Sequence, residues 1–159
     1  MSIDANFELL SRIPIFAGLA QPQIAAIIVK AKKTFFETGE KLVEAGATGD
    51  AAYIILSGKA TSEGAATIGH AIETLLPGAL VGELGMLVEM TYTTTVVATE
   101  RIRCLAITRE GLYQVMQADP SMARHFSDKL MQRLLDLAEE LRAVDAQFAE
   151  IEASFATAG

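Results

Sequence analysis

The stretch best suited to chemistry is residues 81–98, where a glycine turn leads into a short apolar segment and then into a β-branched run. The turn and the apolar segment consist of Gly82, Glu83, Leu84, Gly85 and Met86. A turn that enters a single turn of helix leaves backbone N–H groups without intrahelical partners, at the positive end of the helix dipole. Such a turn is suited to an anion. A plain β-hairpin that carries a helical turn is equally compatible with these residues alone.

Residues of the types used in catalysis and metal binding are few and scattered. His70 lies in the predicted β region and His125 in the last predicted helix, so the clustered ligands of a cupin-type metalloenzyme are not expected. Ser57 and Ser62 have no histidine and acid partners at an interpretable spacing. Cys104, the single cysteine, lies in an apolar run and is expected in the core. We therefore predict that the protein is not an enzyme and holds no metal.

Composition limits the protein class and the partners. The 159 residues are 51% hydrophobic and 21% charged, which is typical of one compact domain. The net charge of −7 argues against direct binding of a nucleic-acid backbone, because that binding needs clustered Lys and Arg. No apolar run approaches the roughly 18 residues of a membrane span, and no secretory signal is visible. We expect no membrane partner and a cytoplasmic location.

The ends of the chain have helical patterns. Apolar residues at helical spacing predict two short N-terminal helices, one over residues 7–16 that Pro14 interrupts and one with Pro22 at its first helical position. Lys30, Lys32 and Lys33 are expected in the last turn of the second helix, where the dipole favours cations. A third helix is expected after residue 107, with Leu112, Val115 and Met116 on one face and its end near residues 119–120.

The middle of the chain has a β pattern. Short β-type runs cover residues 34–36, 41–43, 52–56, 67–76, 93–98 and 101–107, and glycines separate them. Short strands at close spacing with glycine turns indicate an antiparallel sandwich, barrel or jelly roll. The predicted fold class is α+β and mainly β, an antiparallel β-roll of about eight strands with short N-terminal helices and a long C-terminal helix.

The last segment is a long helix with a heptad seam. Residues 121–155 contain no glycine or proline, and their apolar positions alternate steps of four and three: Leu130, Leu134, Leu137, Leu141, Val144, Phe148, Ile151 and Phe155. At about 1.5 Å per residue the helix is roughly 50 Å long and outreaches the β region. We predict a homodimer through this seam, with residues 1–120 as the β-roll and 121–159 as the dimerisation helix. The flanking charges add no attractive pairing, and parallel and antiparallel arrangements both remain open.

The glycine motifs carry a family resemblance. A first set comprises Gly39-Glu40-Lys41-Leu42, Gly46, Gly49-Asp50 and Tyr53-Ile54-Ile55-Leu56-Ser57-Gly58. A second set comprises Pro77-Gly78, Gly82-Glu83-Leu84-Gly85-Met86-Leu87 and Thr94-Thr95-Val96-Val97-Ala98. In order and spacing they resemble the cyclic-nucleotide-binding domain family, and the second set resembles its phosphate-binding cassette. The resemblance covers residues 10–135. It implies the sensor half of a catabolite-activator-type regulator, in which the long helix is the dimer contact.

The resemblance also implies roles for single residues. Glu83 corresponds to the acid that accepts a hydrogen bond from the ribose 2′-hydroxyl, and the amides around Gly85 and Met86 correspond to those that hold the cyclic phosphate. Thr93 corresponds to a hydroxyl or small residue beside the phosphate. The implied ligand-binding set is Gly82, Glu83, Leu84, Gly85, Met86, Tyr92, Thr93 and Thr94. A carboxylate at Glu83 that only stabilises the turn dipole is the alternative.

Two departures from the family pattern concern the ligand. Tyr92 stands where the family has the arginine that binds the cyclic phosphate, and Thr91 replaces the usual proline. Charge-assisted hydrogen bonds contribute about 1.5–3 kcal/mol to binding. Loss of the arginine is therefore expected to weaken the affinity for a cyclic nucleotide by roughly tenfold to over a hundredfold. Replacement cations could come only from elsewhere, with Lys59, Arg101 and Arg103 as candidates. In the long helix, Leu137-Ala138 stands where hydroxyl residues read the purine.

Two functions are compatible with these residues. In the first, the protein is a dimeric regulatory sensor in which cAMP, cGMP or a related phosphorylated ligand at the cassette biases the long helix. In the second, it is a dimeric protein-interaction module with a vestigial or altered pocket, and its output partner is unknown. A transcription factor of this family continues past the dimer helix into a helix-turn-helix domain; the sequence is compatible both with a part of such a regulator and with a free-standing sensor.

Overall fold

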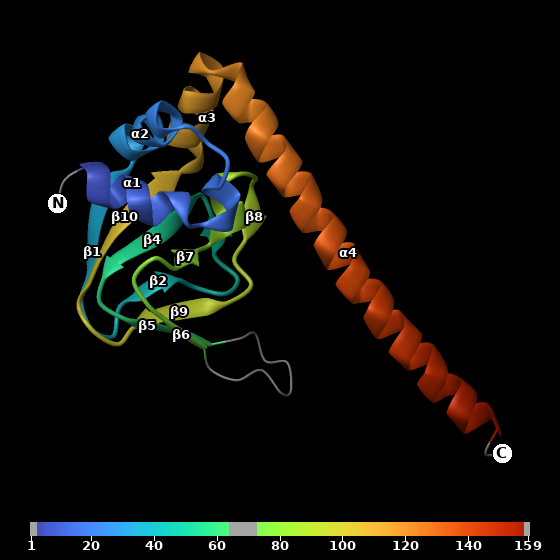
Figure 1. The fold of residues 1–159 in the computed structure, drawn as a ribbon. Helices are drawn as coiled ribbons and strands as arrows, with labels where there is room; N and C mark the ends of the chain where they lie inside the picture. Colours follow the sequence, from blue (N-terminus) through green and yellow to red (C-terminus); the bar gives the residue numbers. More distant parts are fainter. Residues whose placement is uncertain (1–2, 64–72, 158–159) are drawn as a thin grey trace. The chain divides into compact units, whose positions relative to one another are not determined.

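The fold is known from a computed structural model that describes residues 3–63 and 73–157 (Figure 1). Its helices and strands are labelled in chain order. The chain divides into two units, Met1–Ala123 and Arg124–Gly159. The predicted domain boundary after residue 120 stays a prediction.

The first unit is an antiparallel β-roll. One four-stranded sheet has the order β1-β10-β4-β7, with bounds Lys32–Phe36, Ile102–Thr108, Ala51–Ser57 and Leu80–Val81. A second has the order β2-β9-β5-β6, with bounds Lys41–Val43, Thr95–Ala98, Ala60–Glu63 and Glu73–Leu75. A two-stranded ladder pairs β3 (Thr48–Gly49) with β8 (Met90–Thr91). The predicted β-roll is confirmed, with ten strand segments among the described residues in place of about eight.

One core cluster joins residues of both four-stranded sheets. It contains Leu42, Val43, Ile55, Ala60, Val81, Val96, Ala98, Ile102 and Cys104. Cys104 is fully buried, as expected, and desolvation raises the pKa of its thiol to about 11. The edge-to-face pair of Phe36 and Tyr53, with ring centroids 5.6 Å apart, packs against the same cluster. This core fixes the strands that carry the cassette.

Short helices flank the β-roll. They are α1 (Ile3–Ser11), the 3-10 turn η1 (Pro14–Phe16), α2 (Gln21–Lys30) and α3 (Arg109–Ala118). Helix α2 packs against α1, α3 and β10. The N-cap of α2 is Ala20, whose backbone N–H donates to the Gln23 side chain over 2.8 Å, and the N-cap of α3 is Thr108, whose hydroxyl accepts from the Gly111 amide.

Helix α4 (Pro120–Thr157) forms the rest of the chain, and nearly all of the second unit lies within it. The predicted long helix is therefore confirmed. Its distal part exposes large apolar side chains: Leu134, Leu141, Val144, Phe148, Ile151 and Phe155 are each at least 45% exposed. Leu130 and Leu137, the other two residues of the predicted seam, are half-buried.

Several local predictions needed correction. Strands β3, β7 and β8 have two residues each and were not predicted, because so short a segment shows no alternation. Of the predicted run 67–76, the structure describes only the part that holds β6, and His70 lies outside the described residues. Lys32 and Lys33 belong to β1 and not to a helix turn, because Ala31 is extended and ends α2. Helix α2 begins at Gln21, so Pro22 is its second residue.

Candidate ligand site

The predicted anion-binding turn forms as a short 3-10 helix. Gly82 precedes it with φ +72°, a left-handed conformation that favours glycine, and η2 covers Glu83–Met86. The Gly85 amide donates to the Gly82 carbonyl over 2.9 Å, and the Leu87 amide donates to the Leu84 carbonyl over 3.0 Å. Gly85 and Met86 are buried. The Gly85 amide, predicted to hold a phosphate, is thus bonded within the turn.

Tyr92 packs its ring against three glycines. A Cβ placed on Gly82 would lie 2.8 Å from Tyr92 Cε1, and one on Gly49 would lie 2.9 Å from the same atom. At Gly85 the corresponding distance is 3.3 Å. These separations are shorter than ordinary van der Waals contact, so only residues without a Cβ leave room for the ring in this position.

Hydrogen bonds hold both ends of Tyr92. Its hydroxyl donates to the Ala51 carbonyl over 2.7 Å. Its backbone N–H donates to the Ala47 carbonyl over 2.9 Å, and its own carbonyl accepts from the Gly46 amide over 2.9 Å. Burial raises the pKa of Tyr92 above its ordinary value, so the phenol stays protonated and remains a donor near neutral pH. The residue that departs from the family pattern is therefore anchored at both ends to residues 46–51.

Two side chains of α3 reach the cassette. Arg109 Nη1 donates to the Gly49 carbonyl over 3.1 Å and to the Gly85 carbonyl over 3.3 Å. The Tyr113 hydroxyl donates to the Leu87 carbonyl over 2.6 Å. Arg109 is a cation at the turn that sequence analysis missed, because nothing in the residues 101–107 run or the following helix pattern distinguishes it. Its hydrogen bonds to carbonyls show that it braces the backbone.

The other predicted ligand residues differ in environment. Glu83 is half-buried, and its carboxylate makes no hydrogen bond or ion pair within residues 3–63 and 73–157. Leu84 and Thr94 are half-buried, and Thr93 is exposed. The structure therefore brings Gly82, Gly85 and Tyr92 into contact and leaves the Glu83 carboxylate without a cation.

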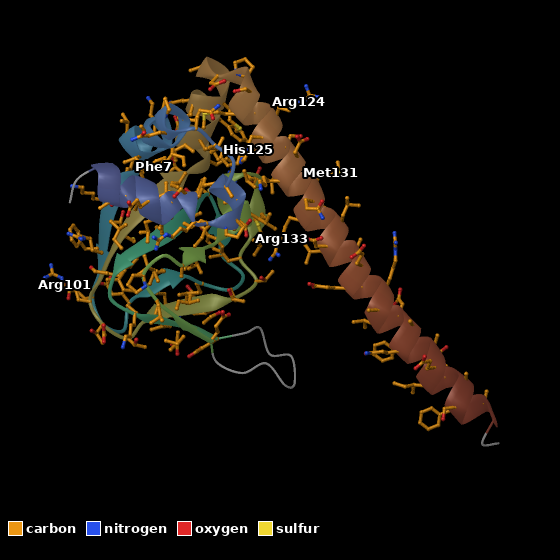
Figure 2. All side chains as sticks on the ribbon, in the orientation of Figure 1. Phe7, Arg101, Arg124, His125, Met131 and Arg133 are labelled. Atoms are coloured by element: carbon orange, nitrogen blue, oxygen red, sulfur yellow. The ribbon has the colours of Figure 1, made fainter. Side chains whose placement is uncertain are left out.

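The proposed replacement cations are placed elsewhere. Lys59 Nζ lies 3.9 Å from a Glu100 carboxylate oxygen, and Arg101 Nε lies 3.2 Å from a Glu37 carboxylate oxygen. Arg101 reaches outward from the surface of the β-roll (Figure 2). Arg103 lies in a surface hollow formed with Phe35 and Ser57, described below. The expectation that one of these three supplies a cation to the cassette receives no support from their contacts.

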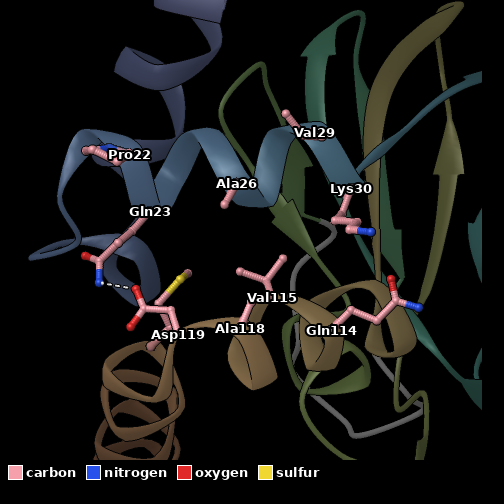
Figure 3. Close-up of a pocket in the computed structure, with 10 residues that line it drawn as sticks. Pro22, Gln23, Ala26, Val29, Lys30, Gln114, Val115, Ala118 and Asp119 are labelled. Carbon is pink, nitrogen blue, oxygen red and sulfur yellow. Dashed lines mark hydrogen bonds between the residues drawn. The ribbon is translucent and has the colours of Figure 1, made fainter.

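A second concave feature lies between helices (Figure 3). A cavity of about 440 Å³ is lined by Pro22, Gln23, Ala26, Val29, Lys30, Gln114, Val115, Ala118, Asp119 and Met122. At one end the Gln23 side-chain amide donates to Asp119 over 3.2 Å. Hydrogen bonds from Ser121 and then from Gln23 lower the pKa of the Asp119 carboxyl. The groove is apolar in its middle and polar at its ends, and it shares no lining residue with the cassette.

Among the described residues, no three His, Cys, Asp or Glu side chains gather as a metal site would require. No helix in the described ranges has the length and apolar character needed to cross a bilayer.

The chain thus combines a β-roll, a glycine turn that enters a short 3-10 helix, short flanking helices and one long helix. Residues 33–119, more than half of the chain, match the family model described as "Cyclic nucleotide-binding domain". The chain belongs to this family.

Curated relatives and solved structures agree with this assignment. The chain is 26% identical over 145 residues to the cyclic AMP receptor protein of Thermus thermophilus, covering 90% of this chain and 67% of that protein. It is 28% identical over 131 residues to a CRP-like cAMP-activated global transcriptional regulator of Mycobacterium tuberculosis, covering 80% of this chain and 58% of the regulator. The N-terminal domain of a transcriptional regulator from Streptomyces coelicolor superimposes with a TM-score of 0.72 at 25% identity, covering 80% of this chain and 93% of that one.

The relatives include proteins of quite different length. The chain spans only 17% of a rice potassium channel, KOR2, to which it is 26% identical over 119 residues, covering 74% of this chain. What holds across these matches is the regulatory cyclic-nucleotide-binding domain itself.

Proposed function

We propose that this domain is a dimeric regulatory interaction module in which Tyr92 occupies and closes the cassette in place of a cyclic nucleotide. The observation that carries the proposal is the position of the Tyr92 ring against Gly49, Gly82 and Gly85, with its hydroxyl bonded to Ala51. The tyrosine packs its ring against the turn and is held there by its bond to the Ala51 carbonyl.

Electrostatics support the same proposal. A cyclic phosphate at this turn would approach the Glu83 carboxylate with no cation paired to it in the described part of the chain. Arg109 is already bonded to two backbone carbonyls. Like charges in a partly buried site repel each other. The phosphate therefore lacks the attraction of the family's arginine, and no cation offsets its repulsion by the Glu83 carboxylate.

The output of the module would pass through α4 and a second copy of the chain. Six of the eight predicted seam residues are at least 45% exposed on the single chain, which leaves an apolar stripe free for a partner helix. A homodimer through this stripe, a non-enzymatic role and a cytoplasmic location all remain parts of the proposal.

A second candidate is the cyclic-nucleotide sensor, in which cAMP or cGMP displaces the Tyr92 ring and biases α4. The observation in its favour is that the Gly82–Glu83 turn keeps the family's glycine and acid, and relatives are described as cyclic AMP receptor and cAMP-activated proteins. It requires the ligand to break the bond between Tyr92 and Ala51 before it can bind.

Calorimetric titration with cAMP and with cGMP separates the two candidates. We expect no saturable heat from the wild type and measurable binding by Tyr92→Arg, because the substitution restores the forked cation and opens the turn. Tyr92→Phe is the matched control, since it removes the hydroxyl bond but adds no charge, and it should stay silent. Circular dichroism and unfolding midpoints verify that each variant folds. Saturable micromolar binding by the wild type would refute the closed cassette and establish the sensor.

A further inference from the structure

The outer face of the sheet β1-β10-β4 carries a small hollow. Its lining residues are Phe35, Ser57, Arg101, Ile102 and Arg103, and its volume is about 210 Å³. We call it the arginine hollow. Drug-sized ligands occupy sites of roughly 300–1,000 Å³, so this hollow has room for one small chemical group.

The sheet register places three of these side chains together. Arg103 of β10 is directly opposite Phe35 of β1 and opposite Ser57 of β4, and directly opposed residues lie on the same face of a sheet. The register between β10 and β4 shifts between Arg103 and Cys104. The residue left without a partner at this shift is Leu56 of β4, and Arg103 keeps its place in the ladder opposite Ser57. Arg103 therefore lies between Phe35 and Ser57 on the sheet, held by backbone pairing on both sides.

Hydrogen-bond donors converge here without an acceptor. Arg103 Nε is fully buried and has no hydrogen-bond partner, and no ion pair or other hydrogen bond engages its guanidinium within the described ranges. The Ser57 hydroxyl is likewise unbonded there. Buried polar groups in folded proteins are almost always satisfied, so an unsatisfied guanidinium nitrogen beside an unbonded hydroxyl makes this hollow a candidate site for an acceptor.

Charge and apolar surface define the class of that acceptor. Arg101 Nε is paired to Glu37 at 3.2 Å, so two guanidinium groups and one carboxylate leave a net charge of +1. This charge matches a monoanion better than a dianion. Phe35 is 54% exposed, and Arg101 Cζ lies 5.8 Å from the centre of its ring, so an apolar surface adjoins the donors.

We propose that the arginine hollow binds a carboxylate that carries an apolar neighbour, with the Arg103 guanidinium as the forked donor and Phe35 as the apolar contact. The carboxylate comes either from a free small acid or from an Asp or Glu side chain of a partner protein. This site shares no lining residue with the cassette, and it does not depend on whether the cassette binds a nucleotide.

The direct test is NMR of the arginine Nε–Hε signals of the full chain, with two probes. One probe is 3-phenylpropanoate, and the other is an acetylated and amidated phenylalanyl-glutamate dipeptide. We expect saturable shifts of the Arg103 signal in the low-millimolar range and weakening with added salt, because the site is open to solvent. Tighter binding of the free acid identifies a small molecule as the source, and tighter binding of the dipeptide identifies a protein side chain.

Variants connect the signal to the hollow. Arg103→Gln should weaken binding by about tenfold or more, as expected for a lost charge-assisted contact. Arg103→Lys should retain part of the affinity, because it keeps the charge without the fork. Arg12→Gln is the charge-matched control, at an exposed arginine in the same unit, and it should bind like the wild type.

Three results would overturn the proposal. The first is the absence of any saturable shift of the Arg103 signal with either probe across the millimolar range. The second is equal binding by the wild type and by a folded Arg103→Gln variant, and the third is tighter binding of inorganic phosphate than of both carboxylates, measured on the Arg103 signal. The first and third are measured on the wild type alone, so they hold even if the Arg103 variants fold poorly.

Discussion

The contact between Gly49 and Tyr92 can be tested by one substitution, Gly49→Ala. The new Cβ would lie 2.9, 3.0 and 3.3 Å from Tyr92 Cε1, Cζ and Cδ1, and no other atom is as near. Gly49 does not have a positive φ, so alanine adds no backbone strain. Since the ring is tied to Ala51 by its hydroxyl, it cannot move aside without losing that bond. Overpacking of this kind costs about 1–3 kcal/mol of unfolding free energy.

A double-mutant cycle isolates this contact. With Tyr92→Ala the ring is absent, and Gly49→Ala should then be neutral or stabilise by about 0.4–1 kcal/mol, because alanine restricts the unfolded chain. The destabilisation of the double mutant should therefore be smaller than the sum of the two single values by about 1–3 kcal/mol. Urea unfolding of the four proteins gives these values, and each 1 kcal/mol corresponds to roughly 2–4 °C in Tm for a chain of this size.

The control cycle replaces Gly49→Ala by Gly111→Ala. A Cβ on Gly111 would meet Thr108 and Lys30 and not Tyr92, so its effect should add to that of Tyr92→Ala within about 0.5 kcal/mol. Additivity in the Gly49 cycle as well would refute the reasoning, because it would mean that the ring does not occupy the space over Gly49. The closed cassette would then lose its main support.

Three further outcomes are expected. Tyr92→Phe should lower the unfolding free energy by about 0.5–1.5 kcal/mol, and Tyr113→Phe by less, because Tyr113 is 44% exposed and water can replace its bond; equal losses in urea unfolding would contradict this. The raised pKa of Cys104, from its ordinary 9.0 to about 11, stabilises the fold below pH 9, and this contribution is lost as the pH rises toward 11. The stability difference between wild type and Cys104→Ala should therefore narrow over that interval, and a constant difference would exclude the shift. Light scattering should show a dimer for the wild type and a monomer for Leu141→Glu. The control Ala143→Glu places the same charge outside the seam and should remain a dimer. A wild type that is monomeric at high concentration would refute dimerisation through the seam.

The larger elements of the fold were predictable because their signals are repeated along the chain. The seam that includes Leu134 and Leu141 gave the long helix, and the β-branched run before Ala98 gave β9. Two-residue strands such as β7 were not predictable, because pairing with β4 and not a residue pattern defines them. Local periodicity in the sequence reflects burial over several residues, so it contains no information about a strand pairing that involves only two residues.

The candidate site was predictable in its backbone but not in its occupancy. The glycine turn at Gly82 was predicted from the motif, the structure adds its left-handed conformation, and Tyr92 was recognised as a departure. That its ring packs over Gly49, from a strand more than forty positions earlier, depends on the pairing of β3 with β8. The role of Arg109 was equally inaccessible, because its acceptors are backbone carbonyls, which every residue possesses.

The hydrogen bonds of Arg109 and Tyr113 couple the position of α3 to that of the cassette. The Arg109 side chain holds Gly49 of β3 and Gly85 within the 3-10 turn, and the Tyr113 side chain holds Leu87 just after the turn. Both side chains arise from α3, one helical turn apart. A displacement of the turn must therefore either carry α3 along or break these bonds. The cassette and α3 are expected to open together in hydrogen exchange, as one cooperative unit, whatever finally drives the turn.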